Sequence, residues 1–403
     1  MSQGLRQSSA LGDLKVLDLS RVLAGPYCSM MMGDLGADIT KIELPEAGDD
    51  TRHWGPPEAG GEAAYYLCLN RNKRSVTVNM KTPEGRDIIR QLALRSDVLI
   101  ENYKVGTLAK MGLGYEELRK ENPRLIYCSI TGFGQNGPYK DKPGYDFMIQ
   151  GMGGVMSFTG EPDGPPMKVG VAIVDITAGL FAFGAILAAL RHRDRTGLGQ
   201  FIDIALLDCV LGWLANVGSN YLVSNELPRR YGNGHPNIVP YEPFKTRDST
   251  FIALAVGNDR QWVDFCRLAA LDHLALDLRF AVNSQRVLNR DELIPIVAEA
   301  MLTKTGEEWL RELDALKIPC GPINTLDKVF SDPQVQARQM VAEVPHPTAG
   351  TVRLVANPIK LSETPCKITR HPPLLGEHTE EVLREVLAYA PEQINDLRAK
   401  GVI

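Results

Sequence analysis

LKVLDLSRVLAGPYCSMMMGDLGADITKIE, at residues 14–43, is the part of this chain that most restricts its fold class. Residues 14–19 form a compact apolar run of strand length, and residues 38–43 alternate apolar and polar side chains as a strand does. Between them, residues 26–35 begin with a proline and have the pattern of a helix. A strand, a helix and a second strand in succession predict a βαβ unit, whose two strands lie parallel in one sheet.

The same alternation continues to about residue 130. Further strands are expected at 75–80, 98–101 and 125–130, and Thr82-Pro83-Glu84 opens a helix that runs to about residue 95. This order predicts an α/β fold with a Rossmann-like large domain, built on a mostly parallel sheet flanked by helices. The turn after the first strand, SRVLAGP, lacks the GxGxxG pattern, and no Walker A motif occurs. Nothing therefore supports a dinucleotide or nucleoside-triphosphate site.

The sequence changes character near residue 225. Residues 227–240, LPRRYGNGHPNIVP, are rich in Pro, Gly, Asn and Arg, as a linker or a functional loop is. Later elements are expected at 251–256 (strand) and, as helices, near 261–268, 291–301, 306–316, 380–387 and 391–401. At 403 residues the chain exceeds one ordinary hydrophobic core, so we expect a second, smaller α+β domain after residue 225.

Composition excludes several classes of protein. Apolar residues make up 44% and charged residues 23% of the chain, as in ordinary globular proteins, and a net charge of −5 argues against a nucleic-acid binder. Seven scattered cysteines without a CxxC, and histidines without HxH or HExxH spacing, predict neither a disulfide framework nor a metal site. The first residues lack the apolar core of a secretory signal. We expect a cytoplasmic enzyme with reduced thiols, and an organelle matrix stays open as an alternative.

One aspartate lies alone in an apolar stretch. VGVAIVDITAGLFAFGAILAAL, residues 169–190, has Asp175 as its only ionisable residue. Burying an unpaired carboxylate is costly, so a compensating use is expected, and the start of a helix would keep such a carboxylate ionised. A dry, ionised carboxylate is a nucleophile or a base. Two alternatives compete: Asp175 could cap a helix that begins near Ile176, or the 22 residues could span a membrane. The aspartate and three glycines disfavour a membrane span and favour a buried core helix.

Several stretches, taken in order, match one known family. They are LDLSRVLAGP (17–26), DLGADITKIE (34–43), NRNKRSVTVNMK (70–81), ENYKVGTLAKMGLGYE (101–116), SITGFGQNGP, PGYDFMIQGMGG, VGVAIVDITAG, HRDRTGLGQ and PLLGEHTEEVL (373–383). Together they cover nearly the whole chain. The ordered set resembles the class III (CaiB/BaiF-type) coenzyme A transferases, of which formyl-CoA transferase is a member.

Three more stretches resemble the succinyl-CoA:glutarate CoA-transferases within that family. They are GDDTRHWGPP (48–57), RYGNGHPNIVPYEPF (230–244) and IPCGPINTLDKVFSDPQVQAR (318–338). The resemblance implies an acyl-CoA donor such as succinyl-CoA and a short dicarboxylic acid such as glutarate as acceptor. Oxalate (as in formyl-CoA transfer), malate and itaconate stay open as alternative acids. CoA enters as a substrate, and no permanently bound cofactor or metal is expected.

The family resemblance also implies an assembly. A large domain formed by residues 1–225 and 326–403 would contain both termini, and a small domain at 226–325 would connect its two parts. Two such open rings would interlock as an obligate homodimer, whose stability is inseparable from association. No nucleic-acid or membrane partner is expected.

By correspondence with family members, Asp175 is implied to be the nucleophile. Its carboxylate would attack the thioester carbonyl of the donor, forming a mixed anhydride and free CoA thiolate, and then an aspartyl-CoA thioester. The residues implied to contact CoA are Leu23, Ala24, Arg74, Val78, Lys81, Asn102, Tyr103, Lys110, Met111 and Tyr145. Two positions depart from the family: Leu44 stands where some members have Arg, and Lys110 replaces an Arg and loses its bidentate geometry toward phosphate.

The far carboxylate of the acceptor acid needs a cationic partner of its own. The candidates are Arg52 and His53 in the GDDTRHWGPP loop, and Arg230 and His235 near the small domain. Each of them could instead be an ordinary loop residue. Gly257 and Asn258 form a turn that could close over the site as a lid.

Rival functions are weighed against transfer. The same fold serves 2-methylacyl-CoA racemases, which use a histidine where this chain has Tyr145. A tyrosine, with an ordinary pKa of about 10, is a poor base for an α-proton at neutral pH. A catalytically inactive acyl-CoA-binding protein is a second rival, which the intact Asp175 disfavours. The missing GxGxxG disfavours an NAD-dependent dehydrogenase, the third.

Overall fold

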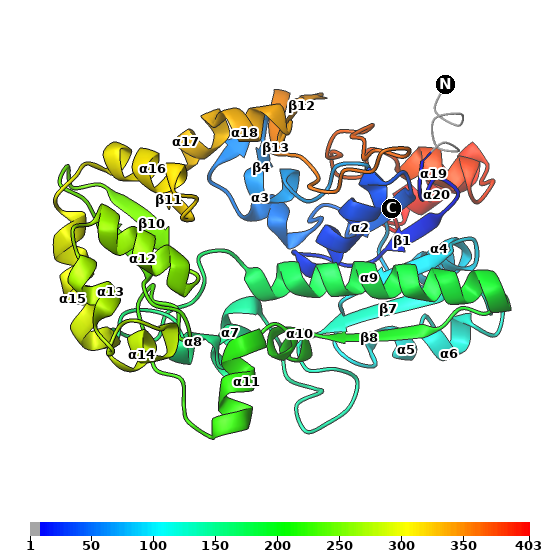
Figure 1. Cartoon of the computed structure of the whole chain (residues 1–403). Helices are drawn as coiled ribbons and strands as arrows, with labels where there is room; N and C mark the ends of the chain where they lie inside the picture. Colours follow the sequence, from blue (N-terminus) through cyan, green and yellow to red (C-terminus); the bar gives the residue numbers. More distant parts are fainter. Residues whose placement is uncertain (1–8) are drawn as a thin grey trace. The chain divides into compact units, whose positions relative to one another are not determined.

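The computed structural model describes residues 9–403, which form two compact units. The first unit contains the described residues up to Gly153, together with Val169–Trp213 and Gln334–Ile403. The second contains Gly154–Lys168 and Leu214–Pro333. The small domain expected at 226–325 lies inside the second unit, which also includes sequence before and after it. Figure 1 traces the chain through both units.

A six-stranded parallel sheet is the centre of the first unit. Its strands are β1 (Lys15–Asp18), β2 (Asp38–Glu43), β5 (Lys73–Thr77), β6 (Val98–Glu101), β7 (Ile126–Thr131) and β8 (Phe201–Ala205). Their spatial order is β5-β2-β1-β6-β7-β8, and each neighbouring pair is parallel. Numbered along the chain this is 3-2-1-4-5-6, the order of a doubly wound Rossmann sheet. The predicted parallel α/β sheet is confirmed.

Helices cover both faces of this sheet. On one face, α2 (Ala24–Asp34) and α9 (Ile173–Thr196) pack against each other, and α9 also contacts β7 and β8. On the other face, α4 (Pro83–Leu94), α19 (Thr379–Glu385) and α20 (Pro391–Ala399) share one core with Leu17 and Leu99. Because both faces are covered, the central strands β1 and β6 are buried along nearly their whole length.

The predicted helix after Thr82 forms where its cap signal lies. The Thr82 hydroxyl accepts a hydrogen bond from the Gly85 amide at 3.0 Å, and proline occupies the first turn of α4. The strand expected at 75–80 is shifted, because β5 ends at Thr77 and Val78 lies beyond it. Strand β8 and the antiparallel hairpin of β12 (Val341–His346) and β13 (Gly350–Val355) were not predicted from the sequence.

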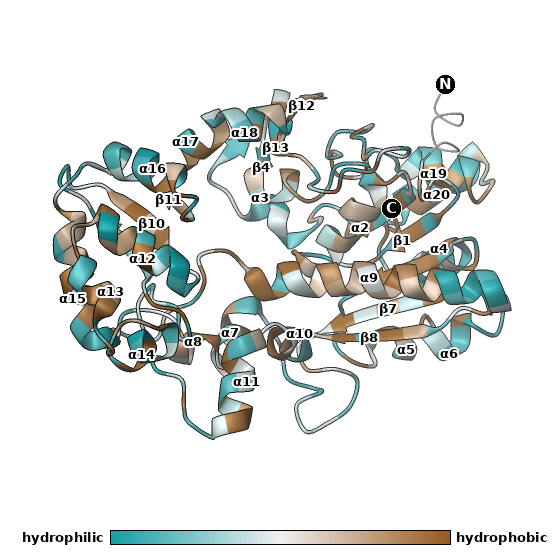
Figure 2. Cartoon of the chain, in the orientation of Figure 1, coloured by the Kyte–Doolittle hydropathy of each residue, from teal (hydrophilic) through white to brown (hydrophobic). Residues whose placement is uncertain are grey.

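Helix α9 is long and apolar enough, by length and composition, to cross a membrane, and 44% of its most apolar window is buried. The pair α10 (Leu206–Gly212) and α11 (Ala215–Ser224), bent by 79°, also passes this test if it is counted as one span. Figure 2 shows the apolar colour along α9, with polar residues at its last turns. Its packing on α2 and the sheet makes α9 a core helix of the first unit. A fully buried helix was expected, but α9 is partly exposed, since Leu180 and Phe181 are 44% and 47% exposed.

The second unit is built on a three-stranded antiparallel sheet. Its strands are β9 (Tyr241–Lys245), β10 (Phe251–Ala255) and β11 (Cys320–Pro322), in the order β11-β10-β9. Its larger helices are α11 (Ala215–Ser224), α12 (Asp259–Leu268), α15 (Arg290–Met301) and α16 (Gly306–Ala315). Trp262, Phe265 and Trp309 are fully buried and centre the core. The expected α+β architecture after residue 225 is therefore present in this unit.

Candidate active site

The sheet order of the first unit defines where a ligand is expected. Connections from β1 lead to β2 on one side, whereas β6 begins the other half of the sheet, so a crevice opens at the carboxyl ends of β1 and β6. A cavity of about 360 Å³ lies there. Six of the residues implied by the sequence line this cavity: Leu23, Ala24, Asn102, Tyr103, Tyr145 and Asp175. The fold thus collects residues that are up to 152 positions apart (175 − 23) around one space.

Asp175 lies in the first turn of α9. The N-cap residue of this helix is Ala172, which has no capping side chain, so the interpretation of Asp175 as an N-cap is wrong. The capping oxygen comes from a different helix, α7 (Asp146–Met152). Asp146 Oδ1 accepts hydrogen bonds from the amides of Val174 at 2.8 Å and Asp175 at 3.4 Å. Because Asp146 satisfies these amides, the carboxyl group of Asp175 is left to the cavity.

The same two carboxylates lie close enough to influence each other. Burial, and then the negative charge of Asp146, raise the pKa of Asp175 from 3.8 to about 7. Burial and the charge of Asp146 therefore oppose the ionisation that the helix start was expected to favour. Near neutral pH the group is divided between its two protonation states, and only the ionised one is a nucleophile.

Two tyrosines lie near this carboxyl group. Tyr145, immediately before Asp146, is 59% exposed and lines the cavity. Burial and the charge of Asp175 raise the pKa of Tyr65 to about 12, so Tyr65 remains a neutral phenol near Asp175. Its ring meets that of Trp54 edge to face, with centroids 5.2 Å apart. The surroundings of Asp175 therefore combine aromatic surface with the neutral hydroxyl group of Tyr65.

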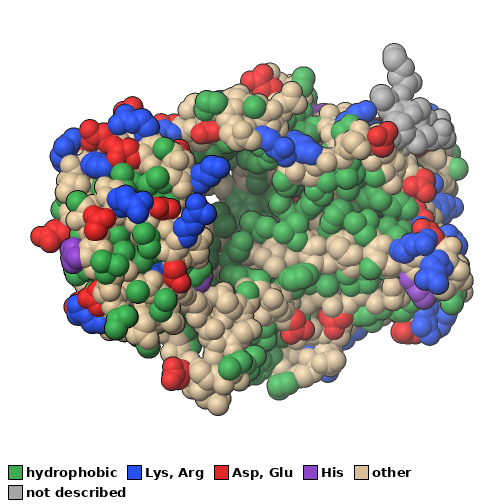
Figure 3. Space-filling model, viewed as in Figure 1, with side chains coloured by type: hydrophobic (Ala, Val, Ile, Leu, Met, Phe, Trp, Pro, Cys, Tyr) green, Lys and Arg blue, Asp and Glu red, His purple; other side chains and the backbone are tan. Residues whose placement is uncertain are grey.

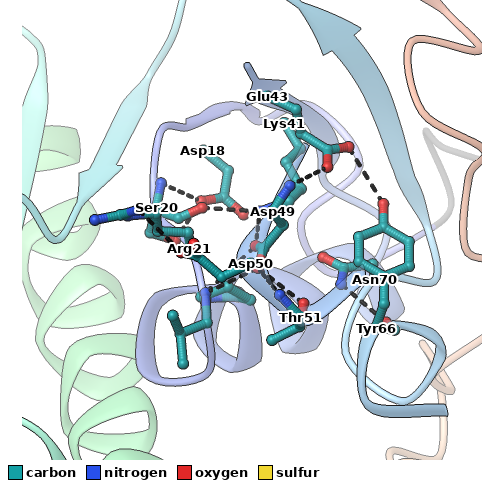
Figure 4. Close-up of polar contacts among 12 residues, drawn as sticks. Asp18, Ser20, Arg21, Lys41, Glu43, Asp49, Asp50, Thr51, Tyr66 and Asn70 are labelled. Carbon is teal, nitrogen blue, oxygen red and sulfur yellow. Dashed lines mark hydrogen bonds and ion pairs between the residues drawn. The ribbon is translucent and has the colours of Figure 1, made fainter. Parts of the chain in front are cut away.

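The turn after β1, residues Ser20–Leu23, forms one wall of the cavity. Its backbone is held by Asn102 from the end of β6: the Arg21 amide donates to Asn102 Oδ1 at 3.0 Å, and Asn102 Nδ2 donates to Arg21 O at 2.7 Å. Asn102, implied as a CoA contact, thus also supports the turn. Val22 has a φ of 71°, which a β-branched residue rarely adopts, at a cost of roughly 1–3 kcal/mol. Such strain requires support from surrounding groups (Figure 4).

A second cavity of about 340 Å³ adjoins the first, because Arg21 and Tyr103 line both. Further residues implied to contact CoA line this second cavity: Val78, Lys81 and Met111. Leu44, at the position where the family has Arg in some members, also lines it. Val78 and Lys81 lie here because the chain leaves the sheet after Thr77. The two cavities together form a path from Lys81 to Asp175, suited to an elongated molecule.

Two residues implied to contact CoA do not line either cavity. Arg74 is buried, and its guanidinium binds Asp38 at 2.7 Å and Glu381 at 3.4 Å, which leaves it unavailable to a phosphate. Lys110 is exposed at the end of α5 (Thr107–Lys110), whereas the next residue, Met111, lines the second cavity. The prediction for Arg74 mistook a strand residue paired with its neighbours for a ligand contact.

Arg52, a candidate for the acceptor carboxylate, is a structural residue in this fold. It is 9% exposed, and its guanidinium is bound by both oxygens of Glu43 at 2.8 Å, by Glu62 at 2.8 Å and by Tyr66 at 2.6 Å. These partners occupy the donors that a substrate carboxylate would need. His53, next to it, contacts the carbonyl of Ala47 at 2.8 Å. Neither residue lines either cavity.

The other four candidates belong to the second unit. Arg230 donates to the backbone carbonyls of Glu161, Pro162 and Gly164. Nδ1 of His235 accepts from the Asn237 amide, and burial and then the charge of Arg290 lower the pKa of His235. Gly257 and Asn258 are exposed, and the Asn258 side chain caps α12 by accepting from the Gln261 amide. Each therefore has a local structural partner.

Sequence reasoning missed three residues of the first unit. Asp146 went unnoticed beside Tyr145, although an acid at the start of a short apolar helix was the available signal. Lys41 and Asp49 form a buried ion pair beneath the turn after β1. Their separation in sequence gave no sign that they meet. Among residues 9–403, no group of three or more His, Cys, Asp or Glu residues could hold a metal ion.

Comparison with known proteins agrees with the resemblance. Residues 11–379 match CoA-transferase family III. The chain is 49% identical over 382 residues to a succinate–glutarate CoA-transferase of Agrobacterium fabrum, with 93% of this chain and 95% of that protein covered. It is 44% identical over 393 residues to the succinyl-CoA:glutarate CoA-transferase of Homo sapiens (98% and 90% covered). A crystal structure of a CaiB/BaiF family protein from Brucella suis has a TM-score of 0.81 at 47% identity (94% and 99% covered). This chain belongs to CoA-transferase family III.

Proposed function

We propose that this CoA-transferase moves CoA from succinyl-CoA to glutarate, with Asp175 as the nucleophile. The names of the two relatives above support the two substrates. The observation that carries the mechanism is the position of Asp175, at the start of α9 and on the wall of the cavity at the switch point of the sheet. A carboxylate at such a place meets a ligand that enters from the carboxyl ends of the strands.

The proposed reaction needs only this carboxylate and the two substrates. Asp175 attacks the thioester carbonyl of succinyl-CoA, which gives an aspartyl–succinyl anhydride and CoA thiolate. The thiolate attacks the aspartyl carbonyl, so succinate leaves and an aspartyl-CoA thioester forms. Glutarate attacks that thioester, and the returning thiolate takes the glutaryl group from the second anhydride. Each covalent step keeps the energy of the thioester, provided that water is excluded.

The two adjoining cavities suggest how CoA lies. Lys81 in the second cavity offers a cation for phosphate, and Met111 and Val78 offer apolar surface for the adenine ring. From there the pantetheine arm would pass Arg21 and Tyr103, which line both cavities, and end at Asp175. Because Leu44 stands where some family members have Arg, this path has one cation fewer. Arg21 is the charged residue that lines both cavities.

An exchange assay tests the proposal. Succinyl-CoA is mixed with glutarate, malate, itaconate or oxalate in turn, and the CoA esters are identified by mass spectrometry. Glutaryl-CoA is expected as the main product. A different ester would keep the chemistry and change the acceptor acid. If solvent deuterium enters the α-carbon of a branched acyl-CoA and no CoA is transferred to any acid, the result would instead support racemisation with Tyr145 in the site.

We also propose that the protein is a cytoplasmic homodimer. Each subunit would have a large domain, formed by residues 1–225 and 326–403, and a small domain at residues 226–325. Leu180 and Phe181 on α9 leave an apolar face of the first unit uncovered, and Figure 3 shows hydrophobic side chains gathered on that side. Exposed apolar faces of this kind are typical of interfaces. All seven cysteines are free thiols, as a reducing compartment would favour. Light scattering at several protein concentrations measures the assembly.

The raised pKa of Asp175 predicts the pH dependence of the reaction. Because attack needs the ionised carboxylate, kcat/KM for succinyl-CoA should rise with pH through about 7 and level off above it. Asp146→Asn removes the neighbouring negative charge and keeps an oxygen for the Val174 amide. This variant should therefore shift the rise to lower pH. Steady-state rates between about pH 5 and pH 9 measure both profiles. A shift to higher pH in the variant would contradict the assignment of Asp146.

A further inference from the structure

The turn after β1 has a conformation that its own residues do not favour. Ser20–Leu23 lines both cavities through Arg21, and the backbone at Val22 lies in the left-handed region with a φ of 71°. A valine disfavours this region because its branched Cβ crowds the backbone. The shape of the cavity wall must therefore be imposed by groups outside the turn.

One ion pair contacts the turn at two points. The Val22 amide donates to both oxygens of Asp49, at 3.2 and 3.3 Å. Lys41 Nζ donates to the carbonyl oxygen of Ser20 at 2.8 Å and to Asp49 Oδ2 at 2.8 Å. Lys41 and Asp49 thus bind the carbonyl before Arg21 and the amide after it. Figure 4 shows Lys41 and Asp49 beside Ser20 and Arg21 of the turn.

The pair is itself held rigidly. The side chains of Lys41 and Asp49 are 1% and 0% exposed. Asp49 Oδ1 also accepts from the amide and the hydroxyl of Thr51, at 3.0 and 2.8 Å, and the Asp49 amide donates to Glu43 Oε2 at 2.9 Å. Every oxygen of the carboxylate is occupied by donors of fixed position. Such a fully bonded group transmits its position to what it binds.

Both members of the pair remain charged across the physiological pH range. Burial opposes ionisation of Asp49, but the charge and hydrogen bond of Lys41 hold its pKa at about 2. Burial alone would lower the pKa of Lys41, and the charges of Asp49, Asp18 and Glu43 raise it above its ordinary value. Since a buried pair often stabilises no more than apolar residues of similar size, stability alone gives little reason for placing one here.

We propose that the Lys41–Asp49 ion pair is a positioning device that holds the Ser20–Leu23 turn, before any ligand arrives, in the shape that binds acyl-CoA. This rests on the proposed function and adds two residues that act through the turn. Both residues also form part of the wall of the second cavity, but their charged groups face each other and the turn. The advantage of a preformed wall is that ligand binding does not have to order it.

The affinity for free CoA, measured by isothermal titration calorimetry, tests the proposal. Lys41→Met keeps the length of the side chain and removes its two donated hydrogen bonds. We expect the Kd for CoA to rise by about tenfold or more. Arg193→Met is the matched control, because it breaks a buried arginine's 2.8 Å ion pair with Asp97 at the amino ends of the strands, at the other end of α9. The control should change the Kd by less than about twofold.

Two outcomes would overturn the proposal. One is an unchanged Kd in a folded Lys41→Met protein, and the other is an equal loss of affinity in Arg193→Met, which would mean that general destabilisation is the cause. If the wild-type protein binds no CoA and exchanges none, the proposed function fails, and this inference, which rests on it, fails with it. If the wild-type protein binds and exchanges CoA, and Lys41→Met binds CoA with the same Kd, this inference is wrong and the proposed function stands.

Amide hydrogen exchange on the wild-type protein gives a test that needs no variant to fold. The Val22 amide is expected to be protected in the free protein nearly as strongly as in the CoA complex, because its acceptor is the buried Asp49 carboxylate. An amide that exchanges freely without CoA and becomes protected only with it would show that the ligand orders the turn. That result would contradict a preformed wall.

Discussion

Asp175→Asn is expected to lose CoA exchange by a factor of about 10³ or more while it keeps its fold. The amide has nearly the same shape as the carboxyl group, so it fits the same place in the first turn of α9. Its weakly nucleophilic oxygen, however, cannot form the anhydride. Because burial and Asp146 raise the pKa of Asp175, ionising this group costs stability in the folded protein. The variant should therefore melt at an equal or higher temperature than wild type at about pH 8, which separates lost chemistry from lost structure.

An oxygen label shows whether Asp175 acts covalently. When glutarate labelled with ¹⁸O in its carboxyl groups attacks the aspartyl-CoA thioester, its oxygen becomes the bridge of the second anhydride. The thiolate then attacks the glutaryl carbonyl, and the bridging oxygen stays on Asp175. The peptide that contains Asp175 should therefore gain ¹⁸O during turnover, as measured by mass spectrometry. Direct attack of glutarate on succinyl-CoA would label the released succinate but not the enzyme, and would contradict the nucleophile assignment.

The central fold was predictable because its signal is local. Most strands of the sheet show in sequence as short runs rich in apolar residues, and the cap signal Thr82-Pro83-Glu84 marks the start of α4 correctly. Strand β8, FIDIA, was missed because it is only five residues long and has neither a regular alternation of polar and apolar residues nor an uninterrupted apolar run. Residues 38–43 illustrate a different limit. Their alternation is typical of a half-exposed strand, yet Lys41 and Glu43 are buried.

The candidate site was predictable where backbone topology decides the outcome, and not where side-chain pairing does. Leu23 and Asn102 follow the strands β1 and β6, and Asp175 lies at the start of α9, so the topology brings all three to one edge of the sheet. Whether an arginine is free depends instead on carboxylates that other segments of the chain supply. Arg74 meets Glu381 and Arg52 meets Glu43, and no local pattern announces either contact. The pKa of Asp175 was not predictable for the same reason, because it depends on burial and on the charge of Asp146 from another helix.

Arg52→Met is expected to destabilise the protein by about 3–5 kcal/mol, the cost of breaking a buried ion pair by removing one partner. Glu43 is 1% exposed at its side chain, and it loses the two hydrogen bonds that Arg52 donates to it. Tyr66 and Glu62 lose a partner as well. Urea unfolding monitored by circular dichroism measures the difference from wild type. His53→Ala, the matched control on the neighbouring exposed residue, should change stability by no more than about 0.5 kcal/mol.

The pH dependence of that loss identifies its cause. In the wild-type protein burial opposes ionisation of Glu43, but Arg52 and Lys41 hold the pKa of Glu43 below its ordinary value, so its contribution to stability is present above that value and lost in acid. Without Arg52 the pKa of Glu43 rises, and protonation then relieves the unpaired buried charge. The gap in stability between wild type and Arg52→Met should therefore narrow as the pH falls from about 8 to 5. A variant that unfolds like wild type at both pH values but loses affinity for glutarate would instead return Arg52 to the acceptor site.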